Sequence, residues 1–266
     1  MPDSAAAASP QRLILVTGAR GGIGRAVVAR LVAAGHRVIA SSRRPAPGTP
    51  QVIPWTVDLA DIDALPAHLK ELVAAHPEVD GVVCCAGRGQ FGALEEFSPP
   101  QIRALMDLNF TAHALLVRAL IPLFKGRGRG DVVFMGSEAA LAGGRRGAVY
   151  SASKAALRGF AQALRDESAK AGVRVCTINP GMVRTPFFDG LSFAPGDDPA
   201  NAVAPEDVAE AVALALEAMP GTVVDEINLS PLKKVVRFKG PVRPSSGEPS
   251  PRTSRRGASG DDLPDP

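Results

Sequence analysis

Residues 13–24 read LILVTGARGGIG, an apolar run followed at once by a glycine-rich turn with the spacing TGxxxGxG. The apolar run 13–17 indicates a buried strand, and the helical period of 22–34 indicates that a helix follows the turn. Glycines let the backbone turn sharply and approach a pyrophosphate, whose charge the free N–H groups at the start of a helix can meet. Any tight strand-to-helix connection uses glycine too, but the place of this turn after the first strand favours dinucleotide binding.

On the C-terminal side of this turn, short apolar runs alternate with segments of helical period. This alternation predicts an α/β fold with a parallel sheet and helices on both of its faces. The predicted strands are 13–17, 37–41, 52–57, 81–85, 131–135, 173–179 and 222–229, and the predicted helices are 22–34, 62–76, 100–125, 149–170 and 205–218. One domain, residues 11–236, accounts for the whole pattern.

Composition and charge narrow the class of protein. With 45% hydrophobic and 21% charged residues, the chain resembles an ordinary globular protein, and we expect no membrane span. Residues 1–10 lack the features of a secretory signal, so we expect a flexible N-terminus and a cytoplasmic protein. Residues 237–266 are rich in Pro, Ser, Gly and Arg without hydrophobic periodicity, which predicts a disordered tail. A net charge of +3 is too small to indicate a nucleic-acid partner.

The end of the second predicted strand indicates which nicotinamide cofactor the turn would bind. Residues 41–44 read SSRR, where a protein that binds the free ribose of NAD would place a carboxylate. Arg43, with Ser42 and with help from Arg20 or Arg44, suits a 2′-phosphate instead, so NADP(H) is expected over NAD(H). The alternative is that these arginines are solvated loop charges. Asp58, after the third strand, would hold the adenine amino group or only cap the next helix.

Tyr150 and Lys154 lie four positions apart in a predicted helix, so their side chains share one face. To act as a base near neutral pH, the pKa of a tyrosine must fall from about 10 to about 7, which costs roughly 4 kcal/mol. A nearby ammonium group and a nicotinamide charge can supply this. Ser137, at the end of the fifth strand, would then hydrogen-bond a reacting carbonyl oxygen. Taken alone, the pair could equally be a surface contact.

The motifs TGxxxGxG at 17–24, Asn109, Ser137, YxxxK at 150–154 and NPG at 179–181 occur in this order. In this respect the chain, from about 13 to 232, resembles the classical short-chain dehydrogenases/reductases. The resemblance implies a single Rossmann-like, doubly wound α/β domain with a seven-stranded parallel sheet flanked by helices. It also implies an NAD(P)(H) cofactor and hydride transfer between its nicotinamide and a carbonyl or secondary alcohol; together with the SSRR segment, this predicts NADP(H).

By the same resemblance, Tyr150 would be the general acid/base, Lys154 would lower its pKa and hold the ribose, and Ser137 would orient the substrate. Asn109 would kink its helix and hold a relay water. The residues expected to contact the cofactor are Gly18, Arg20, Gly21, Gly22, Ile23, Gly24, Ser42, Arg43, Asp58, Leu59, Ala86, Gly87, Asn109, Tyr150, Lys154, Pro180, Gly181, Val183 and Thr185. No metal site is expected.

Two features depart from the family pattern. Cys84 and Cys85 stand where the family usually has two asparagines, so the contacts of those amides must be replaced. With Cys176, they match neither a disulfide framework nor a zinc site and are expected to be buried. Glu138, directly after the serine, is unusual at a position that is often small, and it would turn outward or face the substrate.

The segment 182–201 carries Phe187, Phe188 and Phe193 among prolines and glycines, which is typical of a lid over an apolar substrate. Arg145 and Arg146 precede Tyr150 and suit a carboxylate or phosphate. The ending VVDEINLSPL at 223–232 resembles that of NADP-linked bacterial reductases of small hydroxy acids, sugars and ketones, and this resemblance implies instead a small polar ketone.

Two expectations concern the protein as a whole. Apolar faces on the helices 100–125 and 149–170 predict a homodimer or homotetramer, as the resemblance also does. The alternative to an enzyme is a catalytically silent NADP-binding sensor or interaction protein of the same fold.

Overall fold

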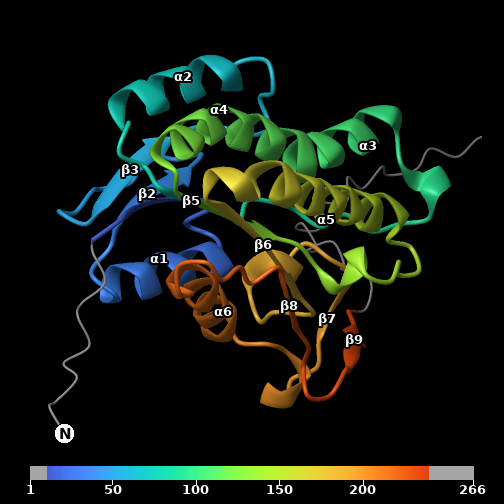
Figure 1. Ribbon diagram of the computed structural model, residues 1–266. Helices are drawn as coiled ribbons and strands as arrows, with labels where there is room; N and C mark the ends of the chain where they lie inside the picture. Colours follow the sequence, from blue (N-terminus) through green and yellow to red (C-terminus); the bar gives the residue numbers. More distant parts are fainter. Residues whose placement is uncertain (1–10, 240–266) are drawn as a thin grey trace, which may run out of the picture.

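The computed structural model describes residues 11–239, so the predictions for the N-terminal ten residues and for 240–266 lie outside the described part. Seven strands form one parallel sheet in the order β3-β2-β1-β4-β5-β6-β8 (Figure 1). Their bounds are β1 Leu13–Thr17, β2 Arg37–Ser42, β3 Val52–Thr56, β4 Gly81–Cys84, β5 Gly130–Met135, β6 Val173–Pro180 and β8 Glu226–Leu229. The predicted seven-stranded, doubly wound fold is confirmed.

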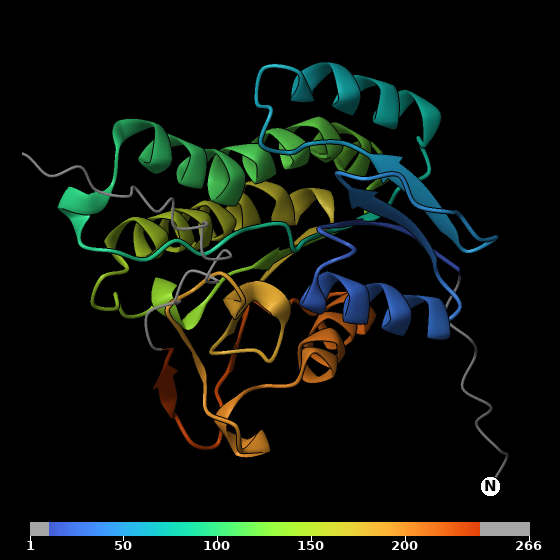
Figure 2. The same ribbon diagram turned by 180° about the vertical axis from the view of Figure 1, so that it is seen from behind.

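Helices cover both faces of this sheet, giving three layers (Figures 1 and 2). On one face lie α2, α3, α4 and α5, and on the other lie α1 and α6, which pack against each other. The bounds are α1 Gly22–Ala33, α2 Leu65–Ala75, α3 Pro99–Met106, α4 Ala112–Arg127, α5 Ala148–Ser168 and α6 Pro205–Glu217.

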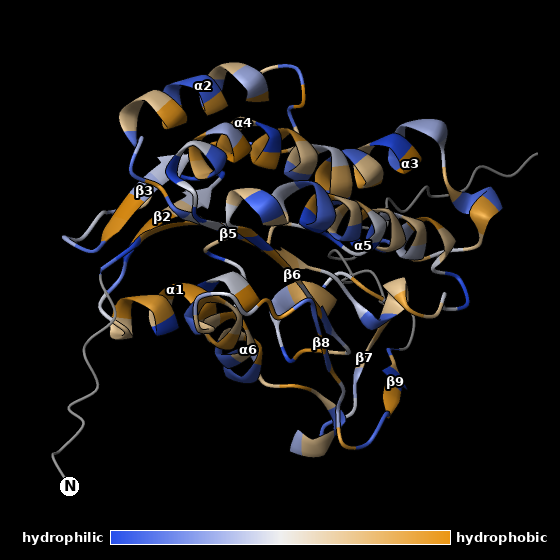
Figure 3. Ribbon diagram, in the orientation of Figure 1, coloured by the Kyte–Doolittle hydropathy of each residue, from blue (hydrophilic) through white to orange (hydrophobic). Residues whose placement is uncertain are grey.

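Alternating strand side chains build two apolar cores, one on each side of the sheet. Leu15 faces the core beneath α2, α4 and α5, and its neighbours Ile14 and Val16 face the core beneath α1 and α6. All three are fully buried, as expected for a parallel sheet covered on both faces. Figure 3 shows the helices with mixed polar and apolar surfaces, since each has only one side against the sheet.

The structure differs from the predicted elements in one helix, in the last strand of the sheet and in a second, small sheet. The expected helix 100–125 runs from Pro99 to Arg127 and contains a π-helical stretch, Asp107–Thr111. The last sheet strand starts at Glu226 and not at 222. A second, two-stranded antiparallel sheet joins β7 Phe193–Pro195 to β9 Val236–Phe238, so ordered structure continues past the predicted domain end at 236.

The helical run Pro99–Arg127 is also apolar enough to span a membrane by length and composition. Core helices of soluble proteins pass the same test, and here Leu116, Leu120 and Phe124 are fully buried in the core beside the sheet. The run therefore gives only weak evidence for a membrane span.

Candidate active site

Two adjoining cavities lie at the carboxyl ends of the strands, where the strand order reverses between β1 and β4. This crevice is where open α/β sheets bind ligands. The larger cavity is about 500 Å³ and the smaller about 100 Å³. Cys85, Gly87 and Arg88, just after β4, line both, so one extended ligand could reach from the first cavity into the second.

The glycine-rich turn forms one wall of the larger cavity. Gly18 has a φ of +62°, which favours glycine, and its carbonyl accepts a hydrogen bond from the Gly21 N–H at 2.9 Å. A Cβ at Gly24 would lie 2.2 Å from the Gly18 carbonyl oxygen, and a Cβ at Gly22 would lie 2.3 Å from the side chain of Thr185. Helix α1 begins here without a side-chain cap or an acidic residue in its first turn, as suits an anion.

Charge around the larger cavity is mainly positive. Three guanidinium groups, those of Arg20, Arg43 and Arg88, line it against the single carboxylate of Asp58. Asp58 accepts a hydrogen bond from the Ala60 N–H at 3.0 Å, so it shapes the turn after β3 while still lining the cavity. The Ser42 hydroxyl donates to the Arg44 carbonyl at 2.6 Å, which holds the loop bearing Arg43.

Most residues predicted to contact the cofactor line one of the two cavities. The larger is lined by the predicted residues Gly18, Arg20, Gly21, Ser42, Arg43, Asp58, Leu59, Ala86 and Gly87. The smaller is lined by the predicted cofactor residues Ile23, Gly87, Tyr150, Lys154, Pro180, Gly181, Val183 and Thr185, and by Ser137, which was predicted as catalytic. Gly22, Gly24 and Asn109 are not among the residues that line either cavity.

The loop after β4 is held without the two asparagines usual at that place. The Thr17 hydroxyl accepts a hydrogen bond from the Ala86 N–H at 3.0 Å, and the Nε2 of His113 lies 2.8 Å from the Ala86 carbonyl oxygen. Burial lowers the pKa of His113 to about 4, so the ring is neutral and carries its proton on Nε2, which donates. Hydrogen bonds from the side chains of Thr17 and His113 to the main chain of Ala86 thus take the place of the contacts that asparagine side chains would make at positions 84 and 85.

Asn109 lies in the π-helical stretch and is fully buried. Its side-chain oxygen accepts from the Arg88 N–H, and its Nδ2 donates to the Arg88 carbonyl, each at 3.0 Å. Nδ2 also lies 3.1 Å from the Ser153 hydroxyl. Asn109 therefore connects the wall shared by the two cavities to α5, the helix that carries Tyr150.

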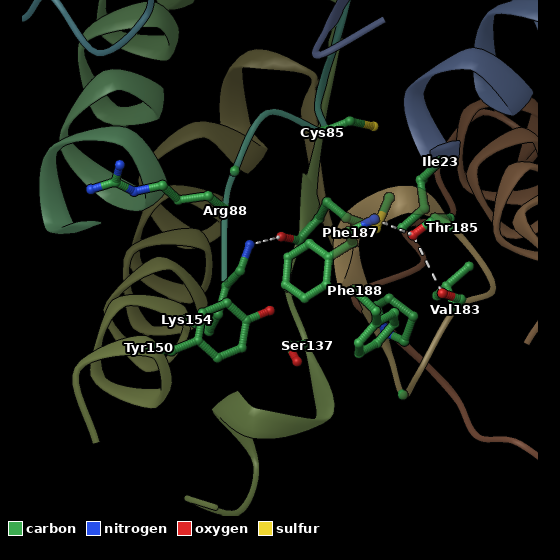
Figure 4. A pocket seen from close by; sticks show the side chains of 15 residues that line it. Ile23, Cys85, Arg88, Ser137, Tyr150, Lys154, Val183, Thr185, Phe187 and Phe188 are labelled. Atoms are coloured by element: carbon green, nitrogen blue, oxygen red, sulfur yellow. Dashed lines mark hydrogen bonds between the residues drawn. The ribbon is translucent and has the colours of Figure 1, made fainter. Parts of the chain in front are cut away.

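Tyr150 and Ser137 face each other across the smaller cavity, with their hydroxyl groups pointing toward one another (Figure 4). Tyr150 comes from the first turn of α5, and Ser137 follows β5. Burial raises the pKa of Tyr150 above its ordinary value; the hydroxyl of Ser137 opposes this shift, and the charge of Glu138 adds to it. The protein's own groups thus favour the protonated phenol at neutral pH.

Lys154 is fully buried one turn after Tyr150, and its Nζ donates to the Met135 carbonyl at 2.8 Å. Burial lowers its pKa from 10.5 to about 8. The dominant influence on the pKa of Tyr150 is its own burial, and the expectation that Lys154 lowers this pKa stays a prediction.

The residues around this centre settle two open alternatives. The Glu138 carboxylate turns toward the Lys234 ammonium group, 2.8 Å away, and is not part of the cavity lining. Arg146 pairs with Glu96 at 2.8 Å, and neither it nor Arg145 lines either cavity. The structure therefore gives no support to the expectation that this arginine pair recognises an anionic substrate.

Some lining residues were not predicted from the sequence to be cofactor-binding or catalytic: Cys85, Arg88, Met135 and Gly136 in the smaller cavity, and Ser41, Val57, Ala60, Ala104 and Leu108 in the larger. Cys85, Met135 and Gly136 end or directly follow parallel strands, so their place at the carboxyl edge of the sheet was a signal available in the sequence.

A model of the short-chain dehydrogenase family matches residues 12–193. A sepiapterin reductase from Chlorobaculum tepidum is 30% identical over 243 residues, covering 83% of this chain and 96% of its own. A solved structure of a putative NAD(P)-dependent gluconate 5-dehydrogenase from Beutenbergia cavernae, with bound NADP, has a TM-score of 0.74 at 32% identity, covering 82% of this chain and 95% of its own. A metagenomic short-chain oxidoreductase in complex with NADP has a TM-score of 0.70 at 30% identity, with coverages of 83% and 96%.

Proposed function

The chain belongs to the short-chain dehydrogenase/reductase family of oxidoreductases, and from that premise we propose that it transfers a hydride between NADP(H) and a carbonyl or secondary alcohol. The observation that carries this proposal is that Tyr150, Ser137 and Lys154 line one small cavity, which adjoins a larger cavity walled by the glycine-rich turn.

The larger cavity fits the phosphate-bearing part of a dinucleotide. Its glycines leave no room for a Cβ at Gly24, and the start of α1 offers unpaired N–H groups to an anion. Arg43 and Ser42 would hold the 2′-phosphate that distinguishes NADP from NAD. Similar structures that contain NADP support a nicotinamide cofactor. Preference for NADP(H) rests on the SSRR segment.

The smaller cavity supplies the acid/base chemistry. Bound NADPH would provide the hydride. In the reduction direction, Tyr150 donates its hydroxyl proton to the substrate's carbonyl oxygen as that oxygen gains charge, and the Ser137 hydroxyl hydrogen-bonds the same atom. Lys154, anchored on Met135, would hold the cofactor ribose and stabilise the phenolate left on Tyr150.

A catalytically silent NADP-binding protein is the rival to this function. The enclosed setting of Tyr150 favours an enzyme, since it places a proton donor in the cavity that adjoins the glycine-rich turn. Cofactor binding without turnover of any carbonyl panel would support the silent protein.

Trp55 offers a direct binding readout. It is the only tryptophan of the chain and pairs in register with Ser41, which lines the larger cavity. Titration with NADPH and NADH should therefore quench its fluorescence. We expect NADPH to bind more tightly than NADH and the advantage to fall in Arg43→Ala. The control Arg37→Ala removes the same charge from the opposite end of β2.

An equal affinity for both cofactors in the wild type, or an unchanged preference in Arg43→Ala, would contradict the NADP assignment. Turnover is tested by following the absorbance of NADPH with a panel of ketones and aldehydes. Cofactor binding with no turnover on the whole panel would contradict the oxidoreductase function itself.

We also propose that the protein forms homodimers or homotetramers in the cytoplasm through α4 and α5. One chain has a mass of 27.5 kDa. Light scattering at micromolar concentration should give a mass of two or four chains, and a single-chain mass would contradict this.

A further inference from the structure

Five aromatic rings form a closed circuit of contacts at the smaller cavity. Tyr150 contacts Phe91 and Phe187, Phe187 contacts Phe188, Phe188 contacts Phe193, and Phe193 contacts Phe91. The centroid distances run from 5.0 to 6.2 Å, the range in which tilted and edge-to-face pairs are favourable. We call these five residues the aromatic ring set.

The rings come from three parts of the chain: the loop after β4, the start of α5 and the segment that follows β6. Figure 4 shows Phe187 and Phe188 beside Tyr150 and Ser137. Tyr150, Phe187 and Phe188 line the cavity directly, and the other two rings pack behind them. A substrate whose carbonyl reaches Tyr150 and Ser137 therefore lies against aromatic faces and edges.

A glycine makes this close assembly possible. A Cβ at Gly89 would lie 2.4 Å from the Phe187 ring and 2.8 Å from the Phe91 ring, and a Cβ at Gly147 would lie 3.4 Å from Phe91. The absence of a side chain at Gly89 thus leaves the space that the Phe187 and Phe91 rings occupy, whereas a Cβ at Gly147 would make only ordinary contact with Phe91.

The exposure of the rings indicates how a substrate enters. Phe187 is 38% exposed, whereas Phe188 is 8% exposed. Phe187 is thus the most exposed of the three rings that line the cavity. A flat substrate ring that enters beside Tyr150 would pass the Phe187 ring and pack against it.

The charges near the cavity disfavour an anionic substrate. The Lys154 ammonium group donates a hydrogen bond to the Met135 carbonyl oxygen. The Arg88 side chain extends away from the rings of Tyr150, Phe187 and Phe188 (Figure 4). A Cβ added at Gly181 would lie 3.1 Å from the Glu138 Oε2, so this carboxylate, although paired with Lys234, lies next to a residue that lines the cavity. Lys154 and Arg88 are the two cations among the described residues that line the smaller cavity.

We propose that the aromatic ring set selects an uncharged carbonyl compound with a planar aromatic group next to the carbonyl. This inference rests on the proposed function, because it names the substrate class of the same site. It departs from the expectation of a small polar ketone raised by the sequence 223–232.

The test compares three carbonyl probes with saturating NADPH: acetophenone, cyclohexyl methyl ketone and benzoylformate. The first two differ in having a flat or a puckered six-membered ring, and the third has a carboxylate in place of the methyl group of the first. We expect kcat/KM to be highest for acetophenone and lowest for benzoylformate. Phe91→Leu and Phe187→Leu should each reduce the preference for acetophenone over cyclohexyl methyl ketone by roughly 2- to 12-fold, the worth of one aromatic pair.

Phe160→Leu is the matched control. It also removes one ring from an aromatic cluster, with Phe110 and Phe134, but outside the aromatic ring set, so the preference should not change. Equal kcat/KM for the two neutral ketones, or a preference for benzoylformate, would overturn the substrate class and leave the oxidoreductase function standing. No turnover of the three probes above a Tyr150→Phe control, with NADPH bound, would likewise overturn the substrate class if other ketones or aldehydes are reduced. No turnover on the whole panel of ketones and aldehydes would overturn the proposed function and with it this inference.

Discussion

The buried ammonium group of Lys154 lies 2.8 Å from the carbonyl oxygen of Met135 and donates a hydrogen bond to it. This bond ties α5 to the carboxyl end of β5. Tyr150 lies one turn before Lys154 on the helix, and Ser137 lies two residues after Met135. The two hydroxyl groups of the candidate site are therefore held opposite each other by the same contact.

The buried ammonium group gives a prediction about stability and pH. Lys154 has a pKa of about 8 in the folded protein against 10.5 ordinarily. Between these values the unfolded chain binds more protons, so this group makes stability rise with pH. The gap corresponds to about 3 kcal/mol. The stability of Lys154→Met relative to wild type should thus fall by about that amount from pH 8 to 10.5, measured by urea unfolding. If the difference in the free energy of unfolding between the two proteins stays constant over this range, burial does not lower the pKa of Lys154.

A second prediction concerns the pH dependence of catalysis. Because the pKa of Tyr150 is raised, the phenol stays protonated through neutral pH, and ketone reduction should hold steady there while alcohol oxidation rises as pH increases. Glu138→Gln removes a negative charge that contributes to the raised pKa. The rising limb of alcohol oxidation should then move to lower pH, as seen in kcat/KM profiles with NADP⁺. If the rise in kcat/KM for alcohol oxidation stays at the same pH or moves to higher pH, Glu138 does not raise the pKa of Tyr150.

The glycine-rich turn gives a third prediction. Gly24→Ala places a methyl group 2.2 Å from the Gly18 carbonyl oxygen, so the turn must shift, and we expect NADPH binding to weaken at least tenfold. Gly159→Ala is the control: it lies inside α5 with no atom within 4 Å of the added methyl group. It should raise stability by up to about 1 kcal/mol. Both effects are read by Trp55 fluorescence, and wild-type affinity in Gly24→Ala would contradict the account of the turn.

The sequence predicts the fold well because its signals are local. Each buried parallel strand is a short apolar run, and the glycine turn, Ser137 and the Tyr150–Lys154 spacing all lie at strand ends or on one helix face. What it could not predict depends on contacts between distant segments. Asn109 holds the main chain of Arg88, and Thr17 with His113 holds that of Ala86. No periodic pattern in the sequence predicts these hydrogen bonds between residues that are far apart in the chain.

The small sheet β7–β9 is missed for the same reason. Each strand has only three residues and no alternating pattern of its own, and each forms only by pairing with the other, more than forty positions away in the chain. The raised pKa of Tyr150 could not be predicted either, because it depends on the burial of this side chain in the fold.

This sheet gives a fourth prediction. Phe193 pairs with Phe238 in register, and the Lys239 ammonium group donates to the carbonyls of Phe188 and Asp189. Strand β9 thus fastens the segment that carries two cavity rings. A chain ending at Val235 should show a raised KM for acetophenone, with NADPH affinity unchanged. A chain ending at Lys239 keeps β9 and serves as control, and equal KM values for the two would show that β9 does not hold the lid.

The most direct test of the central claim compares Tyr150→Phe with the wild type in NADPH-dependent reduction of acetophenone. The variant keeps the ring and its contact with Phe91 but loses the proton donor. It should bind NADPH with wild-type affinity, by Trp55 fluorescence, and lose kcat by on the order of 10²- to 10⁴-fold. A variant that binds NADPH and retains kcat within a few-fold of wild type would contradict the assignment of Tyr150 as the general acid/base.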